Sequence, residues 1–521
     1  MSGSYLLAID AGTGSCRALL FTQKGEEVTS SLREWTHREP PDAPGGQDFD
    51  VDANWQAITA CVRDALGQAG ASGDDVRAVA ATSMREGIVL YDAAGREIWA
   101  CPNVDSRSAQ EAVELIAEGA AERIYADGGD WVSITTPARL RWLARHRPDI
   151  LAATAGLGML SDWIATRLSG VQATEPSCGS SSGMFRLADR TWSSEIAAIC
   201  GLPLSVLPPV TDPGTVIGTV TAAAAAQTGL RAGTPVVAGG ADTQLGLLGV
   251  GARPGEYTVL GGTFWQNTIL LDRPLIDPLV RLRTLCHVVP GQWMLEGIGF
   301  YCGMSMRWFR DAFCAAEVAQ ARQRAVDPYV VMEEAAAQVP PGSGGVLAIL
   351  SNIMNARHWA HASPSFLQFG LGEQARPGGG QAACVRAIEE AAAFVARGHR
   401  DIITELTGTS FTELVFSGGA AKGTLWPQIM ADVLGVPVRV PAVTESSALG
   451  AAICAGTGAG IYSSLSELES DLRPRSRSYE PGAGAVTVYD ERYALWRQVY
   501  QRMLAMSDDG LLSPLWRAAG A

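Results

Sequence analysis

Two stretches about half a chain apart share one pattern: an apolar run, a Gly-Thr turn and a second apolar run. The first is YLLAIDAGTGSCRALLF at residues 5–21, and the second is YTVLGGTFWQNTILL at residues 257–271. Apolar runs on both sides of a short glycine-containing turn predict a β-hairpin. Because one hairpin is common and a repeated one is not, the repeat predicts two similar domains whose hairpins meet across a cleft.

The segment GARPGE at residues 251–256 directly precedes the second copy and has the composition of a loop. We therefore predict an N-terminal domain over residues 1–250 that carries the first hairpin. A C-terminal domain over residues 251–521 would carry the second hairpin. A chain of 521 residues is long enough for two domains with separate cores.

Strand and helix patterns alternate along the chain, which predicts α/β architecture. VRAVAAT at 76–82 and GIVLYD at 87–92 are typical of strands. Helical spacing predicts a helix from Asp52, with Asp52 as its N-cap. A second helical stripe near the C-terminus predicts core packing and consists of Tyr489, Tyr493, Trp496, Tyr500 and Met503.

Composition excludes several classes of partner. The formal net charge of −14 argues against nucleic acid or an anionic membrane surface as the main partner. The ten cysteines form no C-x-x-C pair and no cluster with metal-binding spacing, which favours buried free thiols in a reducing compartment. The chain has no secretory leader pattern and no apolar run long enough to span a membrane. We predict a cytoplasmic protein.

Small residues in the first turn suggest a phosphate site. Turns of this kind leave backbone N–H groups open to phosphate oxygens, and Asp10 adds a carboxylate suited to a hydrated magnesium ion. A third glycine-rich stretch, ELVFSGGAAKG at 413–423, follows a strand and opens a helix, where a nucleotide can approach the backbone. It is not a P-loop. An ordinary hairpin turn and a tight strand-to-helix turn remain alternatives for the two motifs.

Together the motifs resemble the carbohydrate kinases of the FGGY type, the family that includes glycerol kinase, xylulokinase and ribulokinase. The resemblance covers nearly the whole chain. It implies two ribonuclease H-like domains, as in actin and heat-shock chaperones, with an ATP cleft between them and Mg²⁺ as cofactor. The N-terminal domain would hold the substrate site, and the C-terminal domain the adenosine site. The matching stretches are DAGTGSCRALLF (10–21), GGADTQLGLLG (239–249), GGTFW (261–265), CGMSMRWFRD (302–311), FSGGAAKGTLWPQIMADVLGVPV (416–438) and ESSALGAAICAG (445–456).

The resemblance assigns roles to particular residues. Asp10 would orient magnesium through water, and Arg17 would neutralise charge on the bridging oxygens, unless it is only an exposed hairpin arginine. The remaining ATP contacts would come from Gly12, Thr13, Gly14, Ser15, Gly262, Thr263, Gly303, Gly418, Gly419 and Ala420. Gly423 departs from the pattern, because many members carry Asn or Ser against the nucleotide at this position.

Phosphoryl transfer to a hydroxyl needs a base and groups that hold the acceptor. Asp242 is the predicted catalytic base, with a helix N-cap as its alternative role. Arg85 and Glu86 match the pair that grips substrate hydroxyls in the family, with a solvated ion pair as the alternative. Gln244 is a further substrate-side candidate. Ile134 lies where glycerol kinase has a substrate-contacting tyrosine, which argues against glycerol.

Agreement outside the ATP motifs, for example SMREGIVLY at 83–91 and the tail GLLSPLWRAAG at 510–520, implies a specific acceptor. This is the linear signalling compound 4,5-dihydroxy-2,3-pentanedione, phosphorylated on its terminal hydroxyl. A kinase for xylulose or another pentulose or polyol remains an alternative, and an actin-like or chaperone-like nucleotide switch is a third. The same resemblance implies a phosphocarrier protein of the sugar phosphotransferase system as a regulatory partner.

Overall fold

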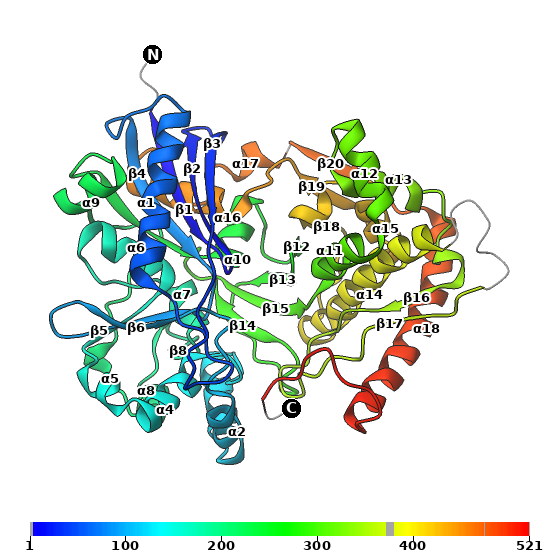
Figure 1. The fold of residues 1–521 in the computed structure, drawn as a ribbon, viewed down its shortest axis with the longest axis horizontal. Helices are drawn as coiled ribbons and strands as arrows, with labels where there is room; N and C mark the ends of the chain where they lie inside the picture. Colours follow the sequence, from blue (N-terminus) through cyan, green and yellow to red (C-terminus); the bar gives the residue numbers. More distant parts are fainter. Residues whose placement is uncertain (1–3, 371–379, 474, 520–521) are drawn as a thin grey trace.

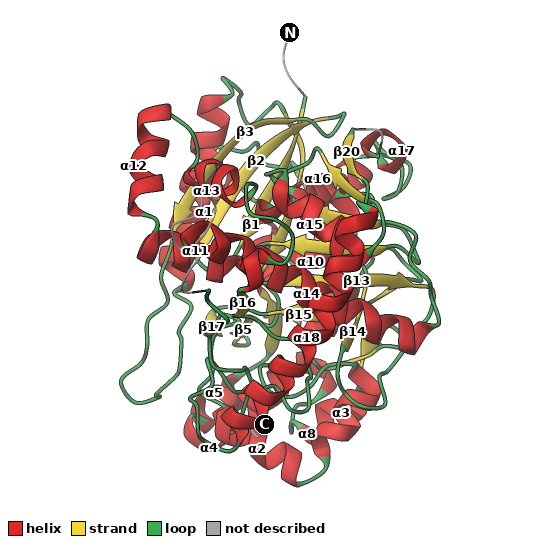
Figure 2. Cartoon of the chain, turned by 90° about the vertical axis from the view of Figure 1, so that its right-hand side faces the viewer, coloured by secondary structure: helices red, strands yellow, loops and turns green. Residues whose placement is uncertain are grey.

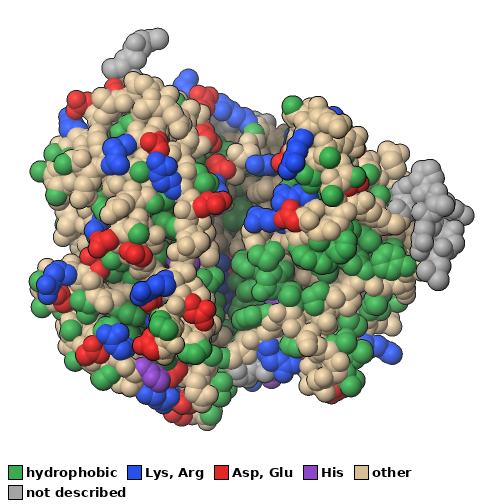
Figure 3. All heavy atoms as spheres, viewed as in Figure 1, with side chains coloured by type: hydrophobic (Ala, Val, Ile, Leu, Met, Phe, Trp, Pro, Cys, Tyr) green, Lys and Arg blue, Asp and Glu red, His purple; other side chains and the backbone are tan. Residues whose placement is uncertain are grey.

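The computed structural model describes residues 4–370, 380–473 and 475–519. The chain forms two lobes, each built around a mixed β-sheet flanked by helices (Figure 1). A deep hollow separates the lobes on the face seen in Figure 3.

The sheet of the first lobe has six strands in the order β10–β11–β4–β1–β2–β3. Three antiparallel strands, β1 to β3, lie at one side, and β4 and β11 join parallel to β1 on the other side. The strands are β1 (Tyr5–Ala11), β2 (Ser15–Thr22), β3 (Glu27–Glu34), β4 (Val76–Ser83), β10 (Val216–Thr219) and β11 (Pro235–Ala241).

The sheet of the second lobe has seven strands in the order β14–β15–β13–β12–β18–β19–β20. Here β12, β13 and β15 are antiparallel neighbours, and β18 and β19 join parallel to β12. The strands are β12 (Tyr257–Gly261), β13 (Trp265–Leu271), β14 (Arg283–Cys286), β15 (Trp293–Gly299), β18 (Leu414–Ser417), β19 (Val438–Pro441) and β20 (Ser476–Tyr479).

The two sheets share one topology. In each, a hairpin begins on the central strand, a third antiparallel strand extends the hairpin side, and parallel strands extend the other side. The hairpins β1–β2 and β12–β13 therefore occupy equivalent places. The sequence repeat is confirmed as a structural repeat, and the predicted α/β fold with two similar domains is confirmed with it.

The first helix, α1 (Val51–Gln68), buries one face against the first sheet. Its N-cap is Asp50, whose side chain accepts a hydrogen bond from the Ala53 backbone N–H at 2.9 Å. The prediction of Asp52 as N-cap is wrong by two residues. Asp52 lies inside the first turn, where a carboxylate interacts favourably with the helix dipole.

An inserted layer of helices and short strands extends the first lobe and surrounds one end of the cleft. Its core includes Leu90, Leu140 and Leu157. Its elements are β5 (Ile88–Tyr91), β6 (Glu97–Cys101), α2 (Ala109–Ala117), α3 (Ala120–Gly128), α4 (Thr136–His146), α5 (Pro148–Ala153), β7 (Gly156–Met159), α7 (Pro176–Ser181), β8 (Phe185–Arg186), β9 (Thr191–Trp192) and α8 (Ser194–Ile199). The helix α6 (Leu160–Ser169), which follows β7, packs on the first sheet instead.

Two helices connect the lobes. α10 (Asp242–Gly249) follows β11, and α16 (Ser446–Gly458) returns from the second half of the chain to pack under the first sheet (Figure 1). Gly249 and Gly450 allow the two helices to touch, because a Cβ on either would overlap a backbone oxygen of the other helix. The division of the chain at residue 250 stays a prediction.

Helices of the second lobe cover its sheet and the nucleoside end of the cleft. Among the predicted core residues, Tyr489, Trp496 and Met503 of α18 are buried, and α18 packs against α14 (Figure 2). These helices are α11 (Cys302–Phe313), α12 (Ala315–Arg324), α13 (Pro328–Ala336), α14 (Gln381–Thr407), α15 (Leu425–Leu434) and α18 (Ala483–Asp508). Elsewhere in the chain lie α9 (Ala222–Thr228), β16 (Leu347–Ile349), β17 (Ser365–Leu367) and α17 (Glu469–Leu472).

All ten cysteines are buried and free. Within the described part of the chain, no helix combines the length and apolar character that crossing a bilayer requires.

Candidate active site

A cleft of about 600 Å³ lies between the lobes, and both hairpins reach it. Six of the residues predicted to bind ATP line it. They are Arg17, Gly262, Thr263, Gly303, Gly419 and Ala420. The structure thus brings residues from distant parts of the sequence to one cavity.

The first turn, Gly12 to Gly14, is held by its carbonyl oxygens. The indole N–H of Trp35 donates to the carbonyls of Gly12 and Thr13 at 3.2 and 3.1 Å. The Trp35 backbone N–H donates to the Gly14 carbonyl at 3.1 Å, and His37 Nε2 lies 2.8 Å from the Thr13 carbonyl. These contacts satisfy the carbonyl acceptors of the turn and fix its backbone.

Asp10 is the last residue but one of β1, next to this turn, and is half-buried. Burial raises the pKa of its carboxyl group to about 7; Arg17 opposes this rise, and the charges of Asp242 and Glu445 add to it. Arg17 itself forms an ion pair with Glu445, the residue just before α16. Arg17 is therefore a partly buried, paired group, which does not fit the alternative of an exposed hairpin arginine.

The second turn is supported differently. The backbone N–H groups of Gly303 and Met304, at the start of α11, donate to the Thr263 carbonyl at 3.2 and 3.3 Å. A Cβ on Gly303 would overlap the Gly262 carbonyl oxygen, so only glycine permits this approach. The helix thus fixes the hairpin through backbone contacts.

The glycine-rich stretch after β18 lies at the nucleoside end. Gly418 has a φ of 93° and sits against the backbone of Gly261, which explains the need for glycine there. A side chain on Gly423 would overlap the carboxylate of Glu333, a residue of α13. The departure from Asn or Ser at position 423 therefore accompanies a carboxylate that fills this space.

Asp242 is the first residue of α10, directly after β11, and its side chain is 36% exposed. Its carboxylate accepts from the Thr243 backbone N–H at 2.6 Å, and Arg85 Nε lies 3.8 Å from the same oxygen. Burial raises the pKa of Asp242; Arg85 opposes the rise and Glu86 adds to it. A raised pKa suits a base that must accept a proton during the reaction.

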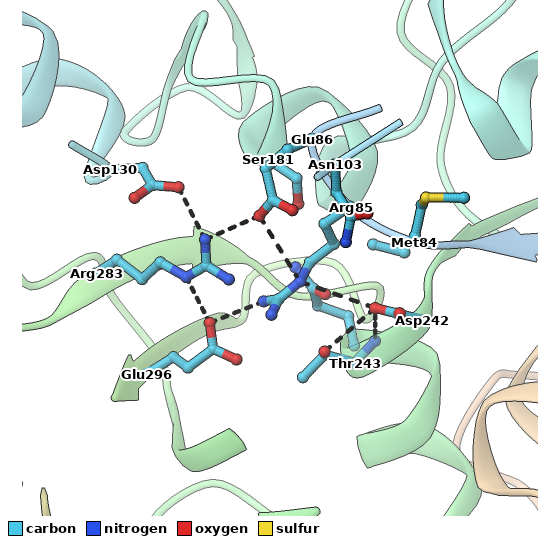
Figure 4. Close-up of polar contacts among 12 residues, drawn as sticks. Met84, Arg85, Glu86, Asn103, Asp130, Ser181, Asp242, Thr243, Arg283 and Glu296 are labelled. Atoms are coloured by element: carbon cyan, nitrogen blue, oxygen red, sulfur yellow. Dashed lines mark hydrogen bonds and ion pairs between the residues drawn. The ribbon is translucent and has the colours of Figure 1, made fainter. Parts of the chain in front are cut away.

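Arg85 and Glu86 belong to a buried network that the sequence did not reveal (Figure 4). Arg85 Nη1 contacts Glu296 at 2.8 Å, and Glu86 Oε1 contacts Arg283 Nη1 at 2.8 Å. Arg283 also contacts Asp130 at 3.1 Å and Glu296 at 2.6 Å. We call Arg85, Glu86, Asp130, Asp242, Arg283 and Glu296 the acceptor cluster.

The acceptor cluster joins the lobes, because Arg283 and Glu296 come from β14 and β15 of the second sheet. Burial raises the pKa of Asp130 to about 6, with Arg283 opposing the rise and Glu86 adding to it. Burial also favours the neutral form of Glu296, but Arg283 and Arg85 outweigh it and hold its pKa below the ordinary value. The cluster therefore contains carboxylates with different proton affinities.

Glu86 is held in an unfavourable backbone conformation, with φ of 61°. Such conformations cost ~1–3 kcal/mol and persist where the surroundings impose them. Arg139 of α4 is fully buried and donates to the Glu86 carbonyl oxygen. Its guanidinium also donates to the Pro102 carbonyl at 3.2 Å and the Asp105 carbonyl at 3.3 Å, so one arginine fixes the loop around Glu86.

Gln244 lies two residues after Asp242 and is fully buried. Its Nε2 donates to the Cys286 carbonyl at 3.4 Å, and its Oε1 has no hydrogen-bond partner among the described residues. The predicted contact of Gln244 with substrate stays a prediction.

Several residues of the site escaped sequence reasoning. Glu296 interrupts an apolar strand and Arg283 begins one, and a charge in a buried strand must find a partner. That signal could have revealed them. Trp35 and His37 carry no comparable signal, because their contacts with the first turn depend on how β3 continues beside it.

The sequence matches the FGGY family of carbohydrate kinases in two parts. The N-terminal domain of the family matches residues 5–249, and its C-terminal domain matches residues 266–459. The chain belongs to this family, and with the cleft described above it is an ATP-dependent carbohydrate kinase.

Among curated proteins, the chain is 45% identical to autoinducer-2 kinase of Yersinia enterocolitica, over 100% of this chain and 98% of that protein. It is also 45% identical to autoinducer-2 kinase of Klebsiella pneumoniae, over 99% and 97% of the two chains.

Solved structures show the same fold. Xylulose kinase from Rhodospirillum rubrum has a TM-score of 0.81 at 27% identity, covering 96% of this chain and 99% of that one. Glycerol kinase from Plasmodium falciparum, solved with ADP, has a TM-score of 0.82 at 19% identity, with coverage of 96% and 99%.

The residues around Asp10 fit a hydrated magnesium ion. Mg²⁺ in nucleotide sites keeps several waters and uses one or two carboxylates together with phosphates. Asp10 offers one carboxylate, and the negative charges of Asp242 and Glu445 raise the pKa of that group further. No group of three or more His, Cys, Asp or Glu residues in the described ranges could hold a metal ion by itself. When bound, the ion would neutralise phosphate charge.

Proposed function

We propose that the protein phosphorylates 4,5-dihydroxy-2,3-pentanedione, the linear form of autoinducer-2, on its terminal hydroxyl with ATP as donor. The observation that carries this proposal is the acceptor cluster, in which Arg85 lies against Asp242, together with full-length similarity to proteins named autoinducer-2 kinase. Mg²⁺ held at Asp10 is part of the proposal.

The charge of the acceptor cluster supports a neutral acceptor. Its four carboxyl groups, from Glu86, Asp130, Asp242 and Glu296, share the two guanidinium groups of Arg85 and Arg283. Surplus negative charge in a buried site repels anionic acceptors such as sugar acids. A dione with two hydroxyl groups carries no charge.

Different residues of the site contribute to different parts of the phosphoryl transfer. The terminal hydroxyl oxygen of the acceptor bonds to the γ-phosphorus of ATP as the bond to the bridging oxygen of the β-phosphate breaks, and ADP leaves. Asp242 accepts the hydroxyl proton. Arg85 donates to an acceptor oxygen and Glu86 accepts from a hydroxyl, while N–H groups of the two hairpins hold the phosphates.

A comparison of acceptors tests this proposal. Release of ADP is measured by a coupled assay with dihydroxypentanedione, xylulose, ribulose and glycerol. We expect kcat/KM for dihydroxypentanedione to exceed the others at least ~10-fold, which one well-placed contact of about 1.4 kcal/mol provides. Equal or better turnover of xylulose would support the pentulose alternative and leave the kinase activity in place.

Two further proposals concern the cellular setting. We propose a cytoplasmic location, where ATP is available and the ten free thiols stay reduced. A phosphocarrier protein of the sugar phosphotransferase system is the proposed partner, and a pull-down with purified phosphocarrier tests that contact.

A further inference from the structure

The nucleoside end of the cleft contains two carboxyl groups that the handling of phosphates does not need. Glu333 of α13 and Glu389 of α14 both line the cleft. The helices α13, α14 and α15 that surround them lie together in the second lobe (Figure 1). Apolar walls from Met306, Val385 and Trp426 enclose the same space. An apolar slot with isolated polar groups is the usual form of a site for a flat heterocycle.

Glu389 and its neighbour Glu390 differ in their partners. Glu390 accepts hydrogen bonds from Ser343 at 2.7 Å and Tyr489 at 2.9 Å, and it pairs with Arg386 at 3.0 Å. Glu389 is only 1% exposed, yet its Oε2 atom has no hydrogen-bond partner in the described part of the chain. A buried carboxyl oxygen without a partner is costly unless a ligand supplies one.

The surroundings of Glu389 favour its neutral form. Burial raises its pKa well above the ordinary value, the charges of Glu333 and Glu390 add to the rise, and Arg386 opposes it. A protonated carboxyl group carries one O–H donor and keeps an acceptor oxygen. It therefore presents a donor and an acceptor side by side, which an ionised carboxylate does not.

Glu333 has a different role from Glu389. Its Oε2 accepts from the Thr424 backbone N–H at 3.2 Å, at the start of α15. This contact holds the loop that carries Gly423, so Glu333 is a positioning residue for the slot. The group left for a ligand is the carboxyl of Glu389.

We propose that the carboxyl group of Glu389 recognises the adenine base of ATP, donating to a ring nitrogen and accepting from the exocyclic amino group. Adenine presents an acceptor nitrogen, N1, next to its 6-amino donor, which complements this pair. The inference rests on the proposed use of ATP, and it identifies the residue that recognises the base.

The experiment removes the carboxyl group from the protein and the 6-amino group from the nucleotide, separately and together. KM is measured for ATP and for purine riboside triphosphate, which lacks the 6-amino group, with wild type, Glu389→Gln and Glu389→Leu. We expect wild type to favour ATP ~10-fold, and Glu389→Gln to stay within ~3-fold of wild type, because a carboxamide also offers a donor and an acceptor. Glu389→Leu should raise KM for ATP ~10–100-fold and abolish the preference, with KM for the acceptor unchanged.

A matched control is Glu334→Gln, which changes an exposed acid next to Glu333 that pairs with Arg324. If Glu389→Leu fails to fold, the pH profile of wild type and Glu389→Gln provides the test. KM for ATP should rise as Glu389 ionises in wild type and not in the Gln variant. Identical pH profiles, or an unchanged ligand preference in Glu389→Leu, would overturn the inference.

A failure of the proposed function can be distinguished from a failure of this inference. If wild type released no ADP with any acceptor, that function would be wrong, and binding of the two nucleotides measured by calorimetry would still test Glu389.

Discussion

The acceptor end and the phosphate end of the cleft are built from different interactions. The acceptor cluster consists of buried ion pairs that link the two lobes, such as Arg85 with Glu296 and Arg283 with Glu86. The phosphate end consists of backbone turns, held by Trp35 on one side and by the start of α11 on the other. The comparison indicates that substitutions in the cluster affect stability and catalysis together, whereas substitutions at the turns affect nucleotide binding alone.

The largest effect should come from Asp242→Asn. Removal of the base should lower kcat ~10²–10⁴-fold, while the dissociation constant for ATP changes little. Steady-state kinetics and calorimetry measure the two quantities on the same protein. Turnover near that of wild type would show that Asp242 is only the first residue of its helix.

Arg283→Met should reduce stability as well as activity. Loss of this guanidinium leaves Glu86, Asp130 and Glu296 with less compensation in a buried site, and breaking such pairs costs ~3–5 kcal/mol. Urea unfolding measures the change, with Arg324→Met, in an exposed pair, as control. A loss of less than ~1 kcal/mol, the value for surface pairs, would contradict a structural role for the cluster.

Gly303→Ala should act on the phosphate end alone. The added methyl group overlaps the Gly262 carbonyl and must displace α11 or the second turn, so KM for ATP should rise ~10–100-fold at nearly constant KM for the acceptor. Gly484→Ala, where a Cβ meets open space in α18, is the matched control. Equal changes in both KM values would remove the distinction between the two ends.

The smallest effect concerns pH. With a pKa of about 7, the Asp10 carboxyl group is protonated below neutral pH and cannot then bind a cation. The apparent affinity for Mg²⁺ should therefore fall by up to ~10-fold per pH unit as pH drops below 7, and level off above it. Magnesium titrations of activity at several pH values, at constant ATP, measure this. The same pH dependence in Asp10→Asn would exclude Asp10 as its source.

Local sequence patterns predicted the parts of the molecule that depend on neighbouring residues. Both hairpins, the strand-to-helix turn after β18 and the buried stripe of α18 follow from short-range turn chemistry and periodicity. Arg85 and Glu86 could be selected from a family motif, but their partners could not. Arg283 reaches Glu86 across 197 positions of sequence, and Arg17 reaches Glu445 across 428. Such pairs depend on the register of β14 and β15 and on the return of α16 to the first lobe.

The same limit explains the error at Asp52. Both Asp50 and Asp52 are good N-cap residues, and the choice between them depends on where the chain leaves the preceding loop. The position of Phe49, buried against Trp35 and Trp163, sets that point, and neither contact is local in sequence.

Proton-coupled ³¹P NMR of wild-type protein with ATP, Mg²⁺ and dihydroxypentanedione tests the central claim most directly, because it identifies the phosphorylated atom. We predict a new phosphomonoester signal split into a triplet by two protons on the adjacent carbon, as only the terminal CH₂ position gives, growing in step with ADP. A doublet would place the phosphate on the secondary hydroxyl. No phosphomonoester above the acceptor-free control would contradict the proposed function itself.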